Sequence, residues 1–172
     1  MTLDFSTDVE VIVTMIPYIT ECVTLFLQHD NSDKTIATPS VKHMLQVDDS
    51  TTHISPNQAT VFHHFTAKCL FLTKSSRPDI SPTVDFLPTI VRAPDTDDWK
   101  NRVCLIHYIR GTIDIPLILS DDLASIPKWW VNGLHAVHPN LQGHYGGCIS
   151  LRRGMPISTS TKKLNNWSSA RI

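Results

Sequence analysis

Apolar residues recur along this chain with two different spacings, which divide it into three parts. Before residue 55, short alternating runs at 3–6 and 11–14 predict two strands, and residues 16–28 carry an apolar stripe at helical spacing. From 55 to 111 the spacing is helical, and after 112 short alternating runs return. The pattern predicts an α+β chain with a small β-β-α piece in 1–54, a three-helix bundle in 55–111 and an antiparallel β-meander in 112–172.

Three helix starts can be recognised in the middle segment. Ser55 is placed to cap the first helix, and Gln58 completes a capping box. Ser-Pro at 81–82 and Pro-Asp at 94–95 predict the starts of the second and third helices. We expect the three helices to share a core made of Phe62, Phe65, Leu72, Leu87, Val91, Trp99, Val103 and Ile106.

Pro88 lies inside the predicted second helix, whose apolar stripe is formed by Val84, Leu87 and Val91. Proline removes a backbone hydrogen bond and clashes with the preceding turn, at a cost of about 3 kcal/mol in a regular helix. We therefore expect Pro88 to weaken the bundle. A tolerated kink is the alternative.

The last segment predicts a meander of three strands. Residues 126–132 form an apolar run with two tryptophans, residues 148–151 follow Gly-Gly, and residues 155–160 alternate after an Arg-Arg-Gly turn. A further strand, residues 115–119, is expected to lead from the bundle into this meander.

Composition indicates a globular chain, since 41% of the residues are hydrophobic and 18% are charged. A net charge of −1 gives no overall electrostatic case for nucleic-acid binding, so basic surface must be local. The four cysteines form no C-x-x-C pair, which is typical of free thiols in a reducing compartment. The apolar run at 11–16 is too short to span a membrane, and we expect an intracellular protein of cytoplasm or nucleus.

Several motifs carry a family resemblance. They are W-W-V-N-G at 129–133 with A-V-H-P-N, H-Y-G-G-C-I-S-L and I-S-T-S-T-K-K-L-N downstream, F-L-T-K-S-S-R-P-D-I at 71–80, and A-P-D-T-D-D-W-K at 93–100. Together they resemble copia-type retrotransposon polyproteins. The resemblance implies a fragment that runs from behind the reverse transcriptase palm (1–54), through a helical connection or thumb-like bundle (55–111), into a truncated ribonuclease H-like domain (112–172).

The resemblance implies an RNA-directed DNA polymerase with ribonuclease H as the parent, using magnesium. In that family a catalytic Asp directly follows Trp-Trp-Val, and this chain has Asn132 there. The next catalytic carboxylate follows a Ser-Ser pair, and here the chain stops shortly after Ser168-Ser169. Two-metal hydrolysis needs clustered carboxylates. We therefore expect an inactive remnant that holds no cofactor.

Gln46-Val47-Asp48-Asp49 contains paired aspartates, as reverse transcriptases do, but Gln46 replaces their aromatic residue and polar residues follow. An acidic surface loop is the better interpretation.

Nucleic acid, in particular an RNA–DNA hybrid, is the expected partner, together with the rest of the polyprotein in the parent family. Binding is expected to be weak and to fall with salt. The candidate residues are Lys74, Arg77, Lys100, Arg102, Lys128, Arg152, Arg153, Lys162 and Lys163. A domesticated nucleic-acid-binding or scaffold protein remains an alternative function.

A small zinc-binding module is a second alternative, because four residues of the last segment are of types that bind zinc. They are His135, His138, His144 and Cys148. His138 and His144 also belong to the family motifs, so they do not require a metal.

We expect the meander to leave an apolar face uncovered beside an open strand edge, because by the resemblance the covering helices would follow residue 172. The residues expected on that face are Trp129, Val131, Ile149, Leu151 and Ile157.

Overall fold

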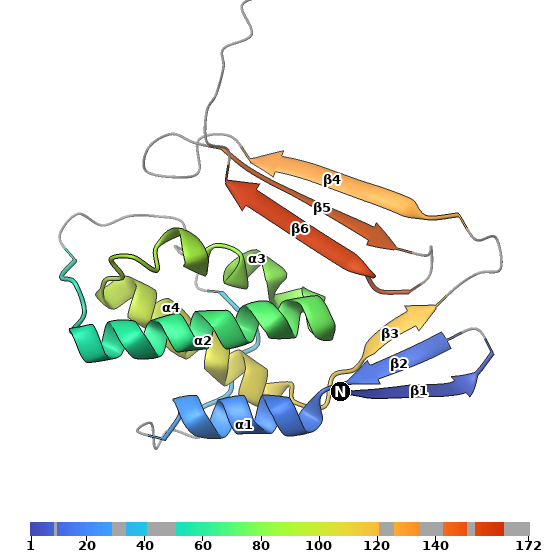
Figure 1. Ribbon diagram of the computed structural model, residues 1–172, viewed down its shortest axis with the longest axis horizontal. Helices are drawn as coiled ribbons and strands as arrows, with labels where there is room; N and C mark the ends of the chain where they lie inside the picture. Colours follow the sequence, from blue (N-terminus) through green and yellow to red (C-terminus); the bar gives the residue numbers. More distant parts are fainter. Residues whose placement is uncertain are drawn as a thin grey trace, which may run out of the picture.

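The chain folds into a helical bundle with two separate three-stranded antiparallel sheets beside it (Figure 1). This computed structural model describes residues 1–8, 10–28, 34–40, 51–120, 126–134, 143–150 and 154–163. The mixed α+β class that the apolar pattern predicts is confirmed. The acidic run at 46–49 lies outside the described residues. No helix of the described part is both long and apolar enough to cross a membrane.

The first sheet joins the beginning of the chain to its middle. It contains β1 (Thr2–Thr7), β2 (Glu10–Thr14) and β3 (Leu117–Ser120) in the order β1-β2-β3. The two N-terminal strands were predicted. β3 was expected to lead into the meander, but it pairs with β2, with Leu117 opposite Val13 and Leu119 opposite Val11. This pairing matches apolar residues across the strands, and it buries Val13 and Leu117.

The bundle is built from α1 (Ile16–Phe26), α2 (Pro56–Ser75) and α4 (Thr96–Gly111), with the one-turn α3 (Ser81–Val84) beside them. Capping boxes begin the two longest helices. The Ser55 hydroxyl accepts from the Gln58 N–H, and the Asp95 carboxylate accepts from the N–H groups of Asp97 and Asp98. Both starts were predicted from the sequence.

The core of the bundle includes α1, which the sequence had assigned to a separate N-terminal piece. Phe26 of α1 meets Phe65 of α2 edge-to-face, with ring centroids 5.1 Å apart. Of the predicted core, Phe62, Phe65, Leu72, Leu87 and Ile106 are buried, while Val91, Trp99 and Val103 are partly buried. The bundle therefore takes its third long helix from the N-terminal segment.

Pro88 does not interrupt a helix, so that prediction was wrong. α3 ends at Val84, and Pro88 is the second residue of a separate 3₁₀ turn, Leu87–Thr89, where its ring is exposed. The fixed φ of proline suits the first turn of a helix. Backbone N–H groups in that turn have no acceptor within the helix, so proline removes no hydrogen bond there.

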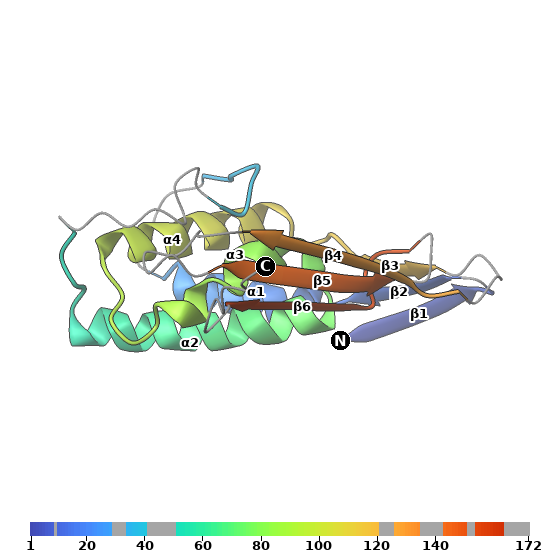
Figure 2. The same cartoon turned by 90° about the horizontal axis from the view of Figure 1, so that it is seen from above.

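The second sheet is the predicted meander. Its strands β4 (Lys128–Leu134), β5 (His144–Ser150) and β6 (Ser158–Lys163) lie in the order β4-β5-β6. Gly146 and Gly147 are inside β5 and not before it, so this strand begins four residues earlier than predicted. β6 is nearest the helices and β4 is farthest from them (Figure 1). From above, β1-β2-β3 extends away from the end of the bundle (Figure 2).

The connection between β5 and β6 lies against β3 and joins the two sheets. The Gly154 N–H donates to the Ser120 carbonyl at 3.2 Å, and the Met155 N–H donates to the Ile118 carbonyl at 2.9 Å. A β-carbon at position 154 would overlap the backbone nitrogen of Ser120. Glycine is therefore required here by the close approach of two backbones.

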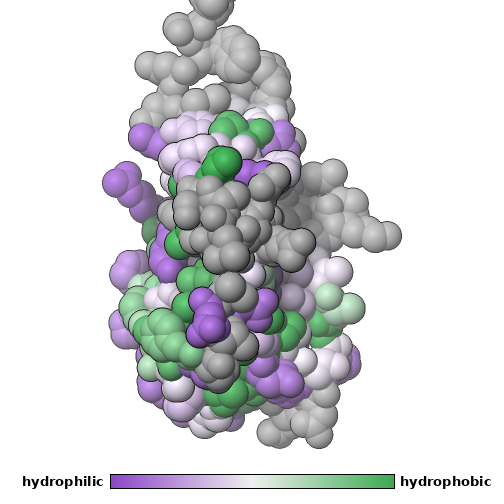
Figure 3. All heavy atoms as spheres, turned by 90° about the vertical axis from the view of Figure 1, so that its right-hand side faces the viewer, coloured by the Kyte–Doolittle hydropathy of each residue, from purple (hydrophilic) through white to green (hydrophobic). Residues whose placement is uncertain are grey.

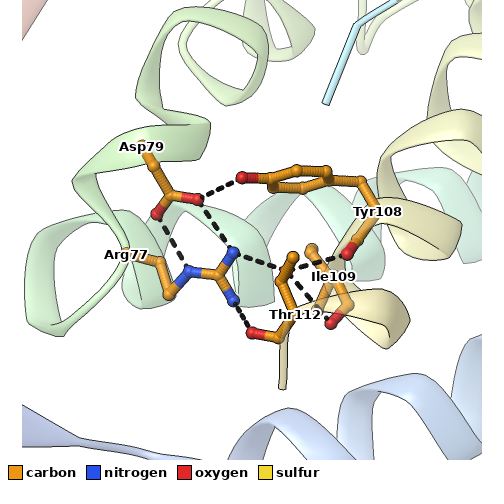
Figure 4. A network of polar contacts seen from close by, with 5 residues as sticks. All are labelled: Arg77, Asp79, Tyr108, Ile109 and Thr112. Atoms are coloured by element: carbon orange, nitrogen blue, oxygen red, sulfur yellow. Dashed lines mark hydrogen bonds and ion pairs between the residues drawn. The ribbon is translucent and has the colours of Figure 1, made fainter. Parts of the chain in front are cut away.

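A buried guanidinium ties the end of α2 to the end of α4 (Figure 4). The Arg77 side chain has no exposed surface, and it donates to both carboxylate oxygens of Asp79 at 2.9 and 2.8 Å. It also donates to the carbonyl and the hydroxyl oxygen of Thr112, both at 2.8 Å. The Tyr108 hydroxyl completes the network with a 3.0 Å bond to Asp79.

Protonation of Asp79 is resisted by this network. Burial alone would raise the Asp79 pKa, but the hydrogen bonds and charge of Arg77 and the Tyr108 hydroxyl outweigh burial and lower it. The pKa of Tyr108 is raised, first by burial and then by its bond to Asp79. Both shifts keep the network in its paired form at neutral pH.

Replacing Asp79 by Asn should destabilise the protein by about 3 kcal/mol at pH 7, because it leaves a buried guanidinium without its counter-charge. A lowered pKa means that the stabilisation is complete above the pKa of the unfolded chain, about 4, and is lost as the pH falls through the folded value. Urea unfolding of both proteins should therefore show a difference that is constant from neutral pH down to about 5 and shrinks below about 4.

The matched control is Glu21→Gln, which removes an ion pair between Glu21 and Lys68 on the bundle surface. It should cost less than about 1 kcal/mol. A difference between the Asp79→Asn variant and the parent that does not change with pH would contradict the assigned role of Asp79.

Replacing Gly154 by Ala should separate the β5–β6 connection from β3, because the added methyl group overlaps the backbone of Ser120. Two backbone hydrogen bonds are then lost, and we expect about 2 kcal/mol of destabilisation in thermal unfolding. Gly133→Ala is the control, since a β-carbon there meets nothing within 4 Å. Equal effects of the two substitutions would show that the contact with β3 does not matter.

Candidate nucleic-acid interface

The surface-exposed strand β4 carries the most prominent apolar side chains of the described surface. Trp129 is 72% exposed, Trp130 is 59% exposed and Val131 is 78% exposed. Side chains alternate between faces along a strand, so these three residues cover both faces of β4. On the end of the molecule shown in Figure 3, hydrophobic side chains reach the surface over both sheets.

The meander face that carries Thr159 points toward α3, because the hydroxyl oxygens of Thr159 and Ser81 lie 3.3 Å apart. The opposite face therefore points away from the helices. The strand register places Trp129 opposite Ile149, Val131 opposite Gly147 and Gly133 opposite Tyr145. Directly opposite residues of an antiparallel pair share a face. Trp129, Val131 and Ile157 are exposed as predicted, Ile149 is half-buried, and Leu151 lies outside the described residues.

Tyr145 and Lys162 are neighbours on this outward face, and both are exposed. An aromatic ring can stack on a base, and a lysine beside it can contact the phosphate. Lys162 was predicted from the sequence as a nucleic-acid contact, but Tyr145 was not. Tyr145 lies three residues before Cys148 and directly precedes Gly146 and Gly147. It was missed because the strand was predicted to begin only after these two glycines.

Asn132 lies near the middle of β4, on the opposite face from Trp129. It is exposed, and its side-chain oxygen accepts a 2.8 Å hydrogen bond from the Gly133 N–H. Its register neighbours are Gly146 on β5 and, one strand further, Thr161 on β6. An amide oxygen without negative charge, next to a glycine and a threonine, is a poor ligand for a hard divalent cation.

The remaining basic candidates are scattered. Lys128 is exposed at the start of β4, while the exposed Lys74 on α2 donates to the Thr159 carbonyl of β6. Lys100 is paired with Asp97 at 2.7 Å. Arg152 and Arg153 lie outside the described residues, and Lys163 ends β6. Lys128 and Lys162 are therefore the two candidates whose side chains are exposed in the described part of the meander.

Two predicted surface cations are buried, so their assignment to a nucleic-acid surface was wrong. Arg77 belongs to the network with Asp79. Arg102 is 4% exposed, lies 4.1 Å from the centre of the Trp99 ring, and donates to the Phe26 carbonyl at 3.1 Å. Burial of the charge is tolerated because aromatic faces and a carbonyl oxygen surround it.

The structure also weighs against the four-residue zinc site. His144 and Cys148 lie four positions apart on the same strand, so their α-carbons are about 13 Å apart, too far for one zinc ion. His135 and His138 lie outside the described residues. The described residues contain no cluster of three or more His, Cys, Asp or Glu side chains that could hold a metal ion.

A cleft of about 190 Å³ lies where the meander meets the bundle. Its lining residues come from the end of α2, from β3 and from the entry to β6, and Lys74 spans it by its bond to Thr159. The cleft is smaller than the roughly 300–1,000 Å³ that is usual for small-molecule sites. We interpret it as an incompletely packed junction.

No family model, no curated protein and no solved structure matches this chain.

Proposed function

We propose that this chain is a catalytically inactive relative of the reverse transcriptase and ribonuclease H region of copia-type retrotransposon polyproteins. The three sequence matches support the proposal. The antiparallel order β4-β5-β6 agrees with the three-stranded opening that the resemblance implies for ribonuclease H. The parent activity would be magnesium-dependent synthesis of DNA on RNA and cleavage of the RNA strand.

The proposal that the chain is catalytically inactive rests on the position and hydrogen bonding of Asn132. It occupies the position at which the resemblance puts the first catalytic carboxylate, and its amide oxygen accepts the hydrogen bond from Gly133. Two-metal cleavage needs carboxylates that hold both ions and stabilise the attacking and leaving oxygens. An amide supplies neither the charge nor the bridging that this chemistry needs.

The purified chain should not cleave a labelled RNA–DNA hybrid with magnesium or manganese. Asn132→Asp should not restore cleavage either, because its register neighbours Gly146 and Thr161 provide no second carboxylate. The measurement is product formation on a denaturing gel, compared with a buffer blank. Cleavage that disappears in Asn132→Ala would overturn the proposal.

Nucleic-acid binding without catalysis is a second candidate function, favoured by the pairing of Tyr145 with Lys162 on the outward face. Stacking on one aromatic ring and contact with a few phosphates would give weak binding with little sequence preference. The net charge of −1 adds no general attraction. This candidate function needs no metal site, so it does not require a carboxylate at position 132.

Binding of single-stranded RNA and of RNA–DNA hybrid should be weak, with a dissociation constant on the order of 10⁻⁵ M, and should decrease steeply with salt. Fluorescence anisotropy should show that Lys162→Ala lowers the salt slope by about one and that Tyr145→Ala weakens single-strand binding. Lys100→Ala is the control, because Lys100 is paired with Asp97 on α4. Tight, salt-insensitive binding, or an equal loss in the control, would rule out this interface.

A further inference from the structure

β4 is an edge strand with an unusually apolar composition. It pairs with β5 along all seven of its residues, and no strand of the described part pairs with its other side. It is the strand farthest from the helices (Figure 1). Trp129, Trp130 and Val131 are each more than half exposed. A long apolar edge with continuous register is a template for pairing with another strand.

β1, an edge strand of the first sheet, is protected in ways that β4 is not. The β1 register shifts between Asp4 and Thr7, and Asp4 carries a charge within the strand. β4 has an uninterrupted register and no proline, and its only charged residue is Lys128 at its beginning. Pairing through an edge is therefore expected at β4 and not at β1.

We propose that β4 pairs with β4 of a second copy of this chain, antiparallel and about a two-fold axis at Val131, which joins two meanders into one six-stranded sheet. Val131 is the central residue of β4, so this register pairs the whole strand. It places each Trp129 opposite Gly133 of the second copy and each Trp130 opposite Asn132 of the second copy. The inference does not depend on the proposed function.

Complementarity within the strand argues for a second copy as the occupant. A β-carbon at Gly133 would meet nothing within 4 Å, so there is open space above this glycine. A Trp129 ring from the second copy can cover that space, as aromatic residues do over edge glycines in designed sheets. Lys128 faces Leu134 of the second copy, so the two lysines do not oppose one another.

The buried area is consistent with a reversible dimer. Each copy would cover two tryptophans and a valine that are now 59–78% exposed. Aromatic side chains bury 150–250 Å² each, so the total over both copies is on the order of 1,000 Å², at the lower limit for a specific interface. We therefore expect a dissociation constant in the roughly micromolar range.

Sedimentation of the full chain at increasing concentration tests the proposal. We expect a monomer–dimer equilibrium that Val131→Lys weakens by about tenfold or more, since it places two ammonium groups opposite each other at the axis. At concentrations well below the dissociation constant, where the chain is monomeric, the thermal transition should not change, because Val131 is 78% exposed. Val61→Lys, at an exposed valine on α2, is the matched control and should leave the equilibrium unchanged. A chain that stays monomeric, or a dimer that Val131→Lys does not affect, overturns the proposal and leaves the edge to a different partner.

Oxidative cross-linking tests the register independently of affinity. In Val131→Cys the two thiols would lie directly opposite, with β-carbons about 4.5–5.5 Å apart, close to the distance of a disulfide. In Asn132→Cys, on the same exposed strand, the thiols would be diagonal neighbours about 7–8 Å apart. Covalent dimer should form in the first variant well above the background of the parent chain. Equal yields from the two variants, or none from either, contradict pairing centred on Val131.

Discussion

The buried positive charge of Arg77 is the constraint on which the rest of the structure depends. A guanidinium without exposed surface is tolerated only if its donors are satisfied and its charge is balanced. Asp79 supplies the charge, and Thr112 supplies two acceptors from the end of α4. The network therefore fixes where α2 and α4 end relative to each other. It also fixes the point from which the chain leaves to form β3.

The path of β3 decides how the two sheets are related. Because α4 ends at Gly111 beside this network, β3 returns to β2 and closes the N-terminal sheet. Its backbone then receives the β5–β6 connection at Gly154. Among the described residues, Thr159 of the meander makes polar contacts with Lys74 and Ser81 of the bundle beside a small cleft.

The two proposals use different parts of the meander. Under the proposed function Asn132 stands at the position of a catalytic carboxylate, and its amide oxygen accepts a hydrogen bond from the Gly133 N–H within its own strand. Tyr145 and Lys162 are the proposed contacts with nucleic acid, whereas Trp129 and Val131 lie on β4, the edge strand that is proposed to pair with a second copy. Nucleic-acid binding and pairing of two copies would thus use neighbouring but different parts of the same sheet.

The sequence by itself determined most of the local structure. The Ser55 and Asp95 caps, the helical apolar stripes and the alternating runs fix short-range geometry, so the long helices and the strands lie close to their predicted positions. The predicted second helix is the exception, because only the one-turn α3 and a separate 3₁₀ turn form there. Trp129 and Val131 are exposed, in agreement with the prediction that the meander leaves an apolar face uncovered. Only the tertiary structure decided that β3 pairs with β2, that Pro88 lies in a separate 3₁₀ turn, and that Arg77 and Arg102 are buried. Residue type is local, but burial and pairing depend on partners far away in the chain, which no periodicity records.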